Sequence, residues 1–397
     1  MVGRGRVMIR GLLRRAAGGA VATSAAAEST HGAADLPIRF EDGLCITGYL
    51  CSEIGLGESA RNLAHACDTQ RLPLSFRNLP LPGRENDQEF VSKCNRLNDR
   101  KAQLMVFGLS SLARLEHEIT RGAVNILYPF WELARVPPQW FTLVHRFDEV
   151  WAPSSFIAQG FPAALGRPVR LVRQPVHLPA AVPPPRSGRE TLRLFTYLDF
   201  DSFGARKNPT AVVNAFRAAF APAQRDVELV VKIRGTHDNG LRRWLMRAAA
   251  ADRRITVIDR TLDRLRMSEL MASCDAFVSL HRSEGFGFGA AEALAAGKAV
   301  VATDYGGTTD FITPETGYPI DYVLEPVRPG EYVESEGQVW ATAREEAAVA
   351  ALRAIHADPG EADARARRGF ALLQTRHSLP IVGIEIARLL RGLGVVS

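Results

Sequence analysis

Short runs of apolar residues alternate along the chain with longer stretches in which apolar residues recur every three or four positions. The first pattern is typical of buried strands and the second of amphipathic helices. In the first half of the chain, strands are predicted at residues 45–50, 103–107, 123–128, 149–152 and 169–173. Helices are predicted between them, at residues 58–67, 110–119, 139–147 and 155–164. Such alternation favours βαβ units and a parallel sheet with both faces covered.

The same alternation restarts after a proline-rich break. Residues 178–190 contain four prolines and no hydrophobic periodicity, which predicts an interdomain linker. Beyond it, strands are predicted at residues 192–198, 227–233, 255–258, 276–280 and 299–303. Helices are predicted at residues 209–220, 241–250, 267–273 and 287–296, through much of 343–375, and at 380–390. We therefore expect an α/β protein with two doubly wound domains in tandem, whose strand ends face a ligand cleft.

These patterns divide the chain into five parts. They are a flexible basic leader (1–40), an N-terminal Rossmann-like domain (41–177), the linker (178–190), a C-terminal Rossmann-like domain (191–376) and a final helix (377–397). The first 35 residues hold five arginines against two acidic residues, and their apolar stretches are too short for a convincing signal peptide. A flexible arm, a weak contact with a membrane surface and an over-extended start are the alternatives for this leader.

Composition narrows the class of protein. Hydrophobic residues make up 46% of the 397 residues and charged residues 23%, which excludes a disordered, collagen-like or small disulfide-rich chain. No apolar run reaches the roughly 18 residues that a membrane-spanning helix needs. The five cysteines form no CxxC pair, which favours a reduced, cytoplasmic compartment. About half of the net charge of +6 lies in the leader, so no nucleic-acid partner is expected.

The most informative segment is a glycine-rich corner between a predicted strand and a predicted helix. Its turn contains Glu284, Gly285, Phe286 and Gly287. Glycines allow backbone to approach a ligand closely, and the first N–H groups of a helix attract anions. Glu284 in the turn and Glu292 in the helix suit the hydroxyl groups of a sugar and a ribose beside a phosphate. The alternative is an ordinary corner in which Glu284 caps the helix and Glu292 lies in solvent.

The stretch EGFGFGAAEALAAGKAVVATDYGG resembles the signature of family 4 glycosyltransferases, group 1 type, with Glu284 and Glu292 as its two glutamates. The resemblance implies a retaining enzyme with the GT-B fold, in which two Rossmann-like domains face each other and a C-terminal helix crosses back. It further implies that Glu292 holds the ribose of a sugar nucleotide and that Glu284 contacts the transferred sugar. The amides of residues 285–288 would lie nearby, with Gly287 and Phe288 facing the pyrophosphate.

Basic residues are expected at two strand ends of the second domain. Arg206 and Lys207 follow its first strand, where the resemblance implies an arginine and a lysine against the donor phosphates, although in the family several residues separate the two. Positive charge there would stabilise the departing diphosphate. Lys232 ends the next strand and could reach the same cleft, while Lys298 is expected on the surface. The alternative is that these side chains are solvated.

Four further residues are candidates. Gly55 and Gly57 stand between a strand and a helix, either as a loop facing the cleft or as a simple tight turn, and a third fingerprint glycine is missing. Glu132 follows Trp131 at a strand end, a combination that suits a sugar site or plain packing. His281 stands at a strand end, where we expect it to contact the donor.

Together with these residues, the resemblance implies a retaining enzyme that moves a hexose of mannose or glucose type from a GDP- or UDP-linked donor. The acceptor would be a glycan or a lipid-linked molecule of surface or exopolysaccharide synthesis, reached in the cytoplasm or at the inner face of the plasma membrane. No cofactor or metal is expected, because Asp199 and Asp201, which have DxD spacing, belong to a fold that usually needs no metal. A non-catalytic nucleotide-sugar- or carbohydrate-binding protein is the first alternative, and an oxidoreductase is the second.

Overall fold

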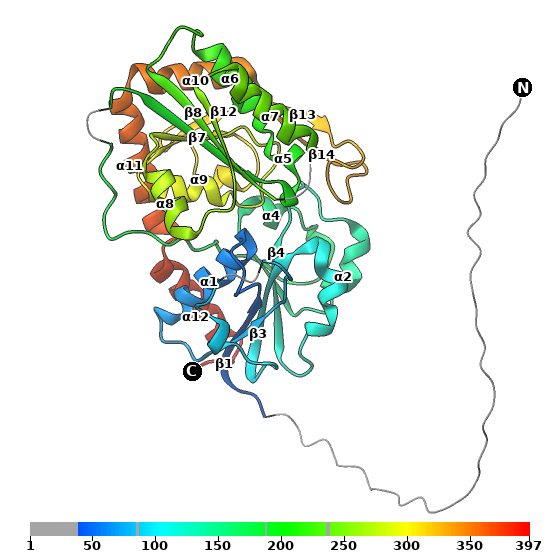
Figure 1. Ribbon diagram of the computed structural model, residues 1–397. Helices are drawn as coiled ribbons and strands as arrows, with labels where there is room; N and C mark the ends of the chain where they lie inside the picture. The colour runs from blue at the N-terminus through cyan, green and yellow to red at the C-terminus, as the bar shows by residue number, and fades with distance from the viewer. Residues whose placement is uncertain (1–38, 85–86, 187–188, 236–238) are drawn as a thin grey trace, which may run out of the picture. The chain divides into compact units, whose positions relative to one another are not determined.

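The computed structural model describes residues 39–397 except 85–86, 187–188 and 236–238, and it contains two six-stranded parallel sheets (Figure 1). The first sheet has the order β2-β1-β3-β4-β5-β6. Its strands are β1 (Glu41–Gly48), β2 (Leu74–Asn78), β3 (Arg100–Gly108), β4 (Val124–Phe130), β5 (Glu149–Ala152) and β6 (Val169–Leu171). The order reverses direction after β2, as in a doubly wound sheet.

The second sheet repeats this plan with the order β12-β11-β10-β7-β8-β9. Its strands are β7 (Leu192–Asp199), β8 (Val227–Arg234), β9 (Ile255–Asp259), β10 (Ala276–Ser279), β11 (Ala299–Thr303) and β12 (Tyr318–Ile320). Helices α6 (Pro209–Ala219), α7 (Asn239–Ala251) and α10 (Glu345–Ala357) pack on one face. Helices α8 (Arg264–Ala272), α9 (Phe288–Ala295) and α11 (Pro359–Arg376) pack on the other. The predicted α/β architecture is confirmed.

The alternation of side chains along β7 explains how both faces of the second sheet are filled. Leu192, Leu194 and Leu198 pack in the cluster that includes α6, α7 and α10. Phe195 and Tyr197, on the opposite side of the strand, pack in the cluster that includes α9. Because successive side chains of a strand point to opposite faces, a nearly continuous apolar run supplies two cores.

Several elements differ from those that the pattern predicts. Helices α2 (Leu112–Leu115), α3 (Phe141–Val144) and α4 (Ser155–Gln159) are shorter than expected and are flanked by 3₁₀ turns. The edge strands β2 and β12 were not predicted, and neither was the hairpin of β13 (Tyr322–Pro326) and β14 (Val339–Ala343). β13 is largely exposed and β12 has only three residues, so neither produces a clear apolar run.

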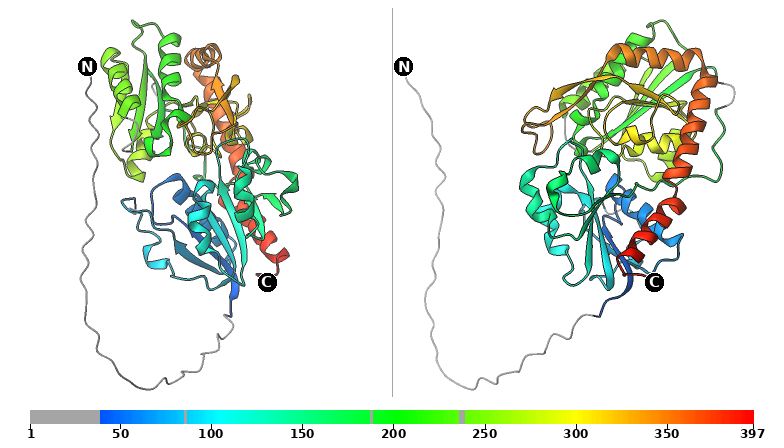
Figure 2. Two further views of the ribbon diagram at one scale, coloured as in Figure 1. Left: turned by 90° about the vertical axis from the view of Figure 1, so that its right-hand side faces the viewer. Right: turned by 180° about the vertical axis from the view of Figure 1, so that it is seen from behind.

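The predicted C-terminal crossing is confirmed. Helix α12 (Leu379–Gly392) follows α11 and packs against α1 (Gly55–Asp68), which lies on the first sheet (Figure 2). The contact is close, because a Cβ atom at Gly383 would stand 2.1 Å from the Ala66 carbonyl oxygen. The chain then reaches β1, where the Gly43 N–H donates to the Val395 carbonyl at 2.8 Å.

We expect Gly383→Ala to lower the free energy of unfolding by about 2 kcal/mol, because overpacking against backbone costs more than the added helix propensity returns. Gly392→Ala is the matched control, since it makes the same change at the end of the same helix, where a Cβ atom would meet no atom within 4 Å. Urea unfolding measures both variants. Equal stability of the two would show that α12 does not depend on this close approach.

The other predicted boundaries stay predictions, and some lie outside the described residues. The described part of residues 178–190 contains no helix or strand. The predicted leader falls almost wholly on residues 1–38, which lie outside the described residues. Among the helices of the described part, none combines the length and the apolar character that a membrane span requires.

Candidate active site

Glu284, in the turn between β10 and α9, is bound by two cations. The Arg206 guanidinium donates to Glu284 Oε2 at 2.8 Å, and the Lys207 ammonium donates to Glu284 Oε1. The Glu284 residue is only 8% exposed. Burial alone would raise the pKa of Glu284, but Arg206 and Lys207 hold that pKa well below its ordinary value. Glu284 is therefore an anion, and the three side chains together carry one net positive charge.

The two cations come from α5 (Gly204–Lys207), a single turn of helix with left-handed residues at both ends. Phe203 has φ +59° and Asn208 has φ +47°. Asparagine adopts this conformation readily and here donates to the Leu280 carbonyl at 3.1 Å, whereas phenylalanine does so rarely. Tertiary contacts therefore hold a strained turn that directs Arg206 and Lys207 toward Glu284.

The charged form of Lys207 is stabilised by its partner Glu284. Burial lowers the pKa of Lys207, and the neighbouring Arg206 lowers it further, while Glu284 opposes both effects. Arginine stays charged in proteins whatever its surroundings. The Arg206–Lys207–Glu284 cluster thus combines a permanent cation with one whose charge the carboxylate supports.

Glu292 lies one turn into α9 and is half-buried. The Tyr197 hydroxyl donates to Glu292 Oε2 at 3.0 Å. Burial and the charge of Glu58 raise the pKa of Glu292 to about 7. The ordinary-corner alternative does not fit, because Gly287 is the N-cap of α9, no described side chain caps that helix, and Glu292 is not free in solvent.

The glycines of the turn are required by close packing against the segment after β11. Gly287 has φ +95°, and a Cβ atom there would stand 2.3 Å from the Thr308 methyl carbon. A Cβ atom at Gly307 would stand 2.1 Å from the Gly285 carbonyl oxygen. The Gly307 N–H also donates to the Glu284 carbonyl at 2.7 Å. No larger residue fits at these positions without moving the turn.

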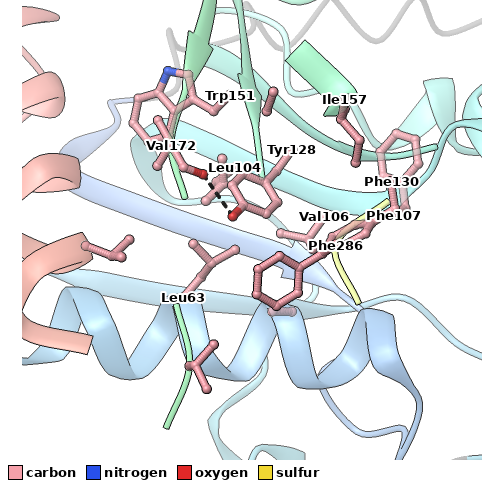
Figure 3. Close-up of a cluster of buried hydrophobic side chains, with 14 of the residues drawn as sticks. Leu63, Leu104, Val106, Phe107, Tyr128, Phe130, Trp151, Ile157, Val172 and Phe286 are labelled. Atoms are coloured by element: carbon pink, nitrogen blue, oxygen red, sulfur yellow. Dashed lines mark hydrogen bonds between the residues drawn. The ribbon is translucent and has the colours of Figure 1, made fainter. Parts of the chain in front are cut away.

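The two phenylalanines of the turn anchor it in the first half of the protein. Phe286 is buried in the cluster that surrounds Leu63, Val106 and Tyr128 (Figure 3). The ring of Phe288 stacks with that of Phe130 at 6.3 Å between centroids. The Phe286 side chain is therefore a packing element, so any contact of this residue with a donor would come from its backbone.

Glu132 reaches the same corner from the first half. Its carboxylate accepts from the Tyr332 hydroxyl, and its carbonyl accepts from the Ser283 hydroxyl. The Ser154 hydroxyl donates to the Gly285 carbonyl beside it. Glu132 is therefore hydrogen-bonded to the residue that precedes Glu284. This position fits both a sugar site and a packing role.

Gly55 and Gly57 lie in the first turn of α1 and not in the loop that the sequence pattern predicts. A Cβ atom at Gly57 would stand 2.1 Å from the Ser52 carbonyl oxygen, so this glycine allows the preceding loop to fold against the helix. At Gly55 a Cβ atom would lie 3.7 Å from the Phe288 ring. The starts of α1 and α9 therefore lie side by side.

The remaining predicted lysines are both buried. Lys232 pairs in register with Tyr197, is 4% exposed, and burial lowers its pKa to about 8. Lys298 was expected on the surface, but it is buried and donates to the Ala272 carbonyl at 2.8 Å. The sequence around Lys298 does not indicate this contact, because the carbonyl that accepts the hydrogen bond belongs to the end of α8.

His281 holds the end of β10 to the segment after β11. Its Nδ1 lies 3.0 Å from the Ser279 hydroxyl, and its Nε2 lies 2.9 Å from the Tyr305 carbonyl. Burial lowers the pKa of His281, which favours the neutral ring. Its contact with a donor stays a prediction.

Sequence reasoning missed Tyr197 and Tyr332. Tyr197 carries a hydroxyl group within the largely apolar strand β7, and this polar group could have marked it as a candidate. Tyr332 lies in the loop between β13 and β14, where no hydrophobic periodicity singles it out.

The carboxylates of the DxD pair are bound by arginines. Asp199 accepts from Arg234 at 2.8 Å and from Arg84 at 3.1 Å, and Asp201 accepts from Arg84. Arg84 follows the first sheet's edge strand β2, so this ion-pair group joins segments that are far apart in the chain.

Comparison with known families finds a match in the part of the chain that holds the charge cluster. Residues 201–336, about a third of the chain, match the family model described as "Glycosyl transferases group 1". This region contains Arg206, Lys207, Glu284 and Glu292. A search of curated proteins found no match.

Solved structures extend the likeness to most of the chain. A sucrose-phosphate synthase from Thermosynechococcus elongatus is 15% identical with a TM-score of 0.64, over 90% of this chain and 100% of that one. HepE from Anabaena, in complex with UDP and glucose, is 13% identical with a TM-score of 0.61, over 89% and 100%. The fold is GT-B. A third GT-B structure, the lipopolysaccharide outer core galactosyltransferase WaaB, is 12% identical with a TM-score of 0.61, over 87% of this chain and 98% of that one.

Proposed function

We propose that this GT-B protein is a glycosyltransferase that takes its sugar from a nucleoside-diphosphate donor. The observation that carries the proposal is the Arg206–Lys207–Glu284 cluster at the start of α9, in which Arg206 and Glu284 are buried, with Glu292 one turn further along. Its net positive charge suits a diphosphate, and its carboxylates suit hydroxyl groups. The family match over residues 201–336 supports the same conclusion.

Each residue of the cluster has a role in this proposal. Arg206 and Lys207 stabilise the negative charge that develops on the diphosphate as the glycosidic bond breaks. Glu284 orients the transferred hexose, and Glu292 accepts hydrogen bonds from the ribose hydroxyls. Binding the donor and acceptor in one orientation supplies the rest of the rate increase.

We further propose transfer with retention of the anomeric configuration. The donor's own phosphate would accept the acceptor's proton, so no side chain is assigned as the base. A UDP- or GDP-linked hexose of glucose or mannose type and a glycan or lipid-linked acceptor are proposed. The HepE structure, with UDP and glucose, supports this donor class. NMR of the product's anomeric proton tests the stereochemistry, and an inverted product would exclude retention.

A panel of UDP- and GDP-linked sugars tests the function directly. A donor that binds the native state should raise the melting temperature. Incubation of that donor with oligosaccharide or lipid-linked acceptors should then release nucleoside diphosphate in step with product. Binding without either transfer or hydrolysis would instead favour a non-catalytic nucleotide-sugar-binding protein.

Glu292→Ala should weaken donor binding by roughly ten- to a hundredfold, because hydrogen bonds to a charged group are lost. The fold should stay intact, since Glu292 is only half-buried and its carboxylate accepts a hydrogen bond from a single phenol, Tyr197. Calorimetric titration with the donor measures the affinity. Glu269→Ala is the matched control, because it removes an exposed glutamate from α8 on the same face of the sheet. Equal affinity of both variants would remove the ribose role from Glu292.

A further inference from the structure

Tyr197 is fixed in place beside Glu292. Its ring lies 5.6 Å from that of Phe277 between centroids, and a Cβ atom at Gly289 would stand 3.2 Å from its edge. Burial and the neighbouring carboxylate raise the pKa of Tyr197 well above its ordinary value. The hydroxyl therefore stays protonated and donates its hydrogen bond to Glu292 Oε2.

Charged groups from three other elements face Glu292. Burial is the largest influence and raises the pKa of Glu292, and Glu58 from α1 raises it further. Arg264 from α8 and Lys207 from α5 lower it, as does the hydrogen bond from Tyr197. Because the result is a pKa of about 7, the carboxyl group stands near the balance between its two forms at neutral pH.

We propose that Tyr197 is a positioning residue that favours the ionised form of Glu292 and orients its carboxylate toward the ribose hydroxyls of the donor. The inference rests on the proposed function for its ligand, but the contact between the two side chains does not. An ionised carboxylate accepts bonds from two hydroxyls, whereas a protonated one has become partly a donor. The Tyr197 hydroxyl thus increases the fraction of protein molecules in which Glu292 is ionised at neutral pH, and these molecules bind the donor more tightly.

The sign of the pH dependence follows from the direction of the contact. A hydrogen bond donated to the ionised form lowers a carboxyl pKa, so Tyr197→Phe should raise the pKa of Glu292 further. Donor affinity of the native protein should rise as pH increases through about 7. In Tyr197→Phe the same rise should occur at higher pH.

The first experiment follows Glu292 itself. Carbon-13 NMR of glutamate-labelled protein, with the resonance assigned by its loss in Glu292→Gln, measures the titration in native protein, in Tyr197→Phe and in Tyr318→Phe. Tyr318 lies in the outer strand β12 of the same sheet and serves as the matched control. A midpoint that moves upward only in Tyr197→Phe supports the inference. An unchanged midpoint overturns it, whether or not any nucleotide binds.

The second experiment measures binding of UDP and GDP to the same three proteins. Relative to native protein, Tyr197→Phe should lose roughly tenfold in affinity near pH 6.5 and come within about twofold near pH 9. The nucleotide and Lys232 also titrate in this range, but they affect the affinity of all three proteins, so the comparison is made between proteins at the same pH. A loss that is constant with pH would show that Tyr197 only packs. Failure of native protein to bind either nucleotide would instead count against the proposed function, while the NMR result still decides the role of Tyr197.

Discussion

Lys207→Ala is expected to lower kcat by roughly 100- to 1000-fold, the usual cost of removing one preorganised charge that stabilises a transition state. The effect on kcat should exceed the effect on donor affinity, because charge on the leaving diphosphate increases as the bond breaks. Steady-state kinetics with the donor found in the panel measures both parameters. Lys207 lies in α5 and contacts Glu284, so the change removes one member of the cluster and leaves Arg206.

Lys101→Ala is the control for this variant. Lys101 lies at the start of β3, at the opposite end of the strand from the cluster. Its side chain is 45% exposed and forms an ion pair with Asp42. Its removal should leave kcat within about twofold, since exposed ion pairs contribute little. If Lys207→Ala retained the rate of this control, Lys207 would be a structural partner of Glu284 without a role in catalysis.

Glu284→Ala is expected to abolish measurable transfer and to lower the free energy of unfolding by about 3–5 kcal/mol. The cost arises because Arg206, which is buried, would keep its charge without its main partner. Activity and urea unfolding should be measured on the same preparation. Glu346→Ala, at an exposed position in α10, is the control and should change stability by less than about 0.5 kcal/mol.

A double variant separates the two effects of Glu284. Removing Lys207 together with Glu284 deletes one charge of each sign from the same ion pair, so the combined loss of stability should be smaller than the sum of the single losses. Additive losses would mean that the two side chains do not interact in solution. The lowered pKa of Glu284 adds a test of pH dependence: its stabilising effect should be complete above about pH 4.5 and be lost only in strong acid.

Much of the candidate site could be predicted from short segments. The corner with Glu284 and Glu292 is local: a strand, a glycine turn and a helix follow one another within about twenty residues. Arg206 and Lys207 also stand where the strand-then-helix pattern indicates a strand end. Because the carboxyl ends of parallel strands share one edge of a sheet, the pattern alone predicts that these residues lie at the same edge, but not that they form ion pairs.

The start of α1 shows why the sequence pattern places the ends of helices less accurately than their centres. Ile54, the residue before the helix, is not a capping residue, and Gly55 and Gly57 disfavour helix. The pattern therefore predicts a loop there. Packing of α1 against the preceding loop, together with the close fit at Gly57, offsets the poor intrinsic propensity. Tertiary contacts decided this boundary.

By itself, the order of residues determined the alternation of strands and helices, the division into two sheets, and the corner that carries two carboxylates. These depend on periodicity and on neighbours a few positions apart. The tertiary structure alone decided that Phe286 lies in the first half's core, that Tyr332 reaches Glu132, and that the Tyr197 hydroxyl donates to Glu292. Burial and charge interactions depend on distances between groups that are about a hundred or more positions apart, and only folding establishes those distances.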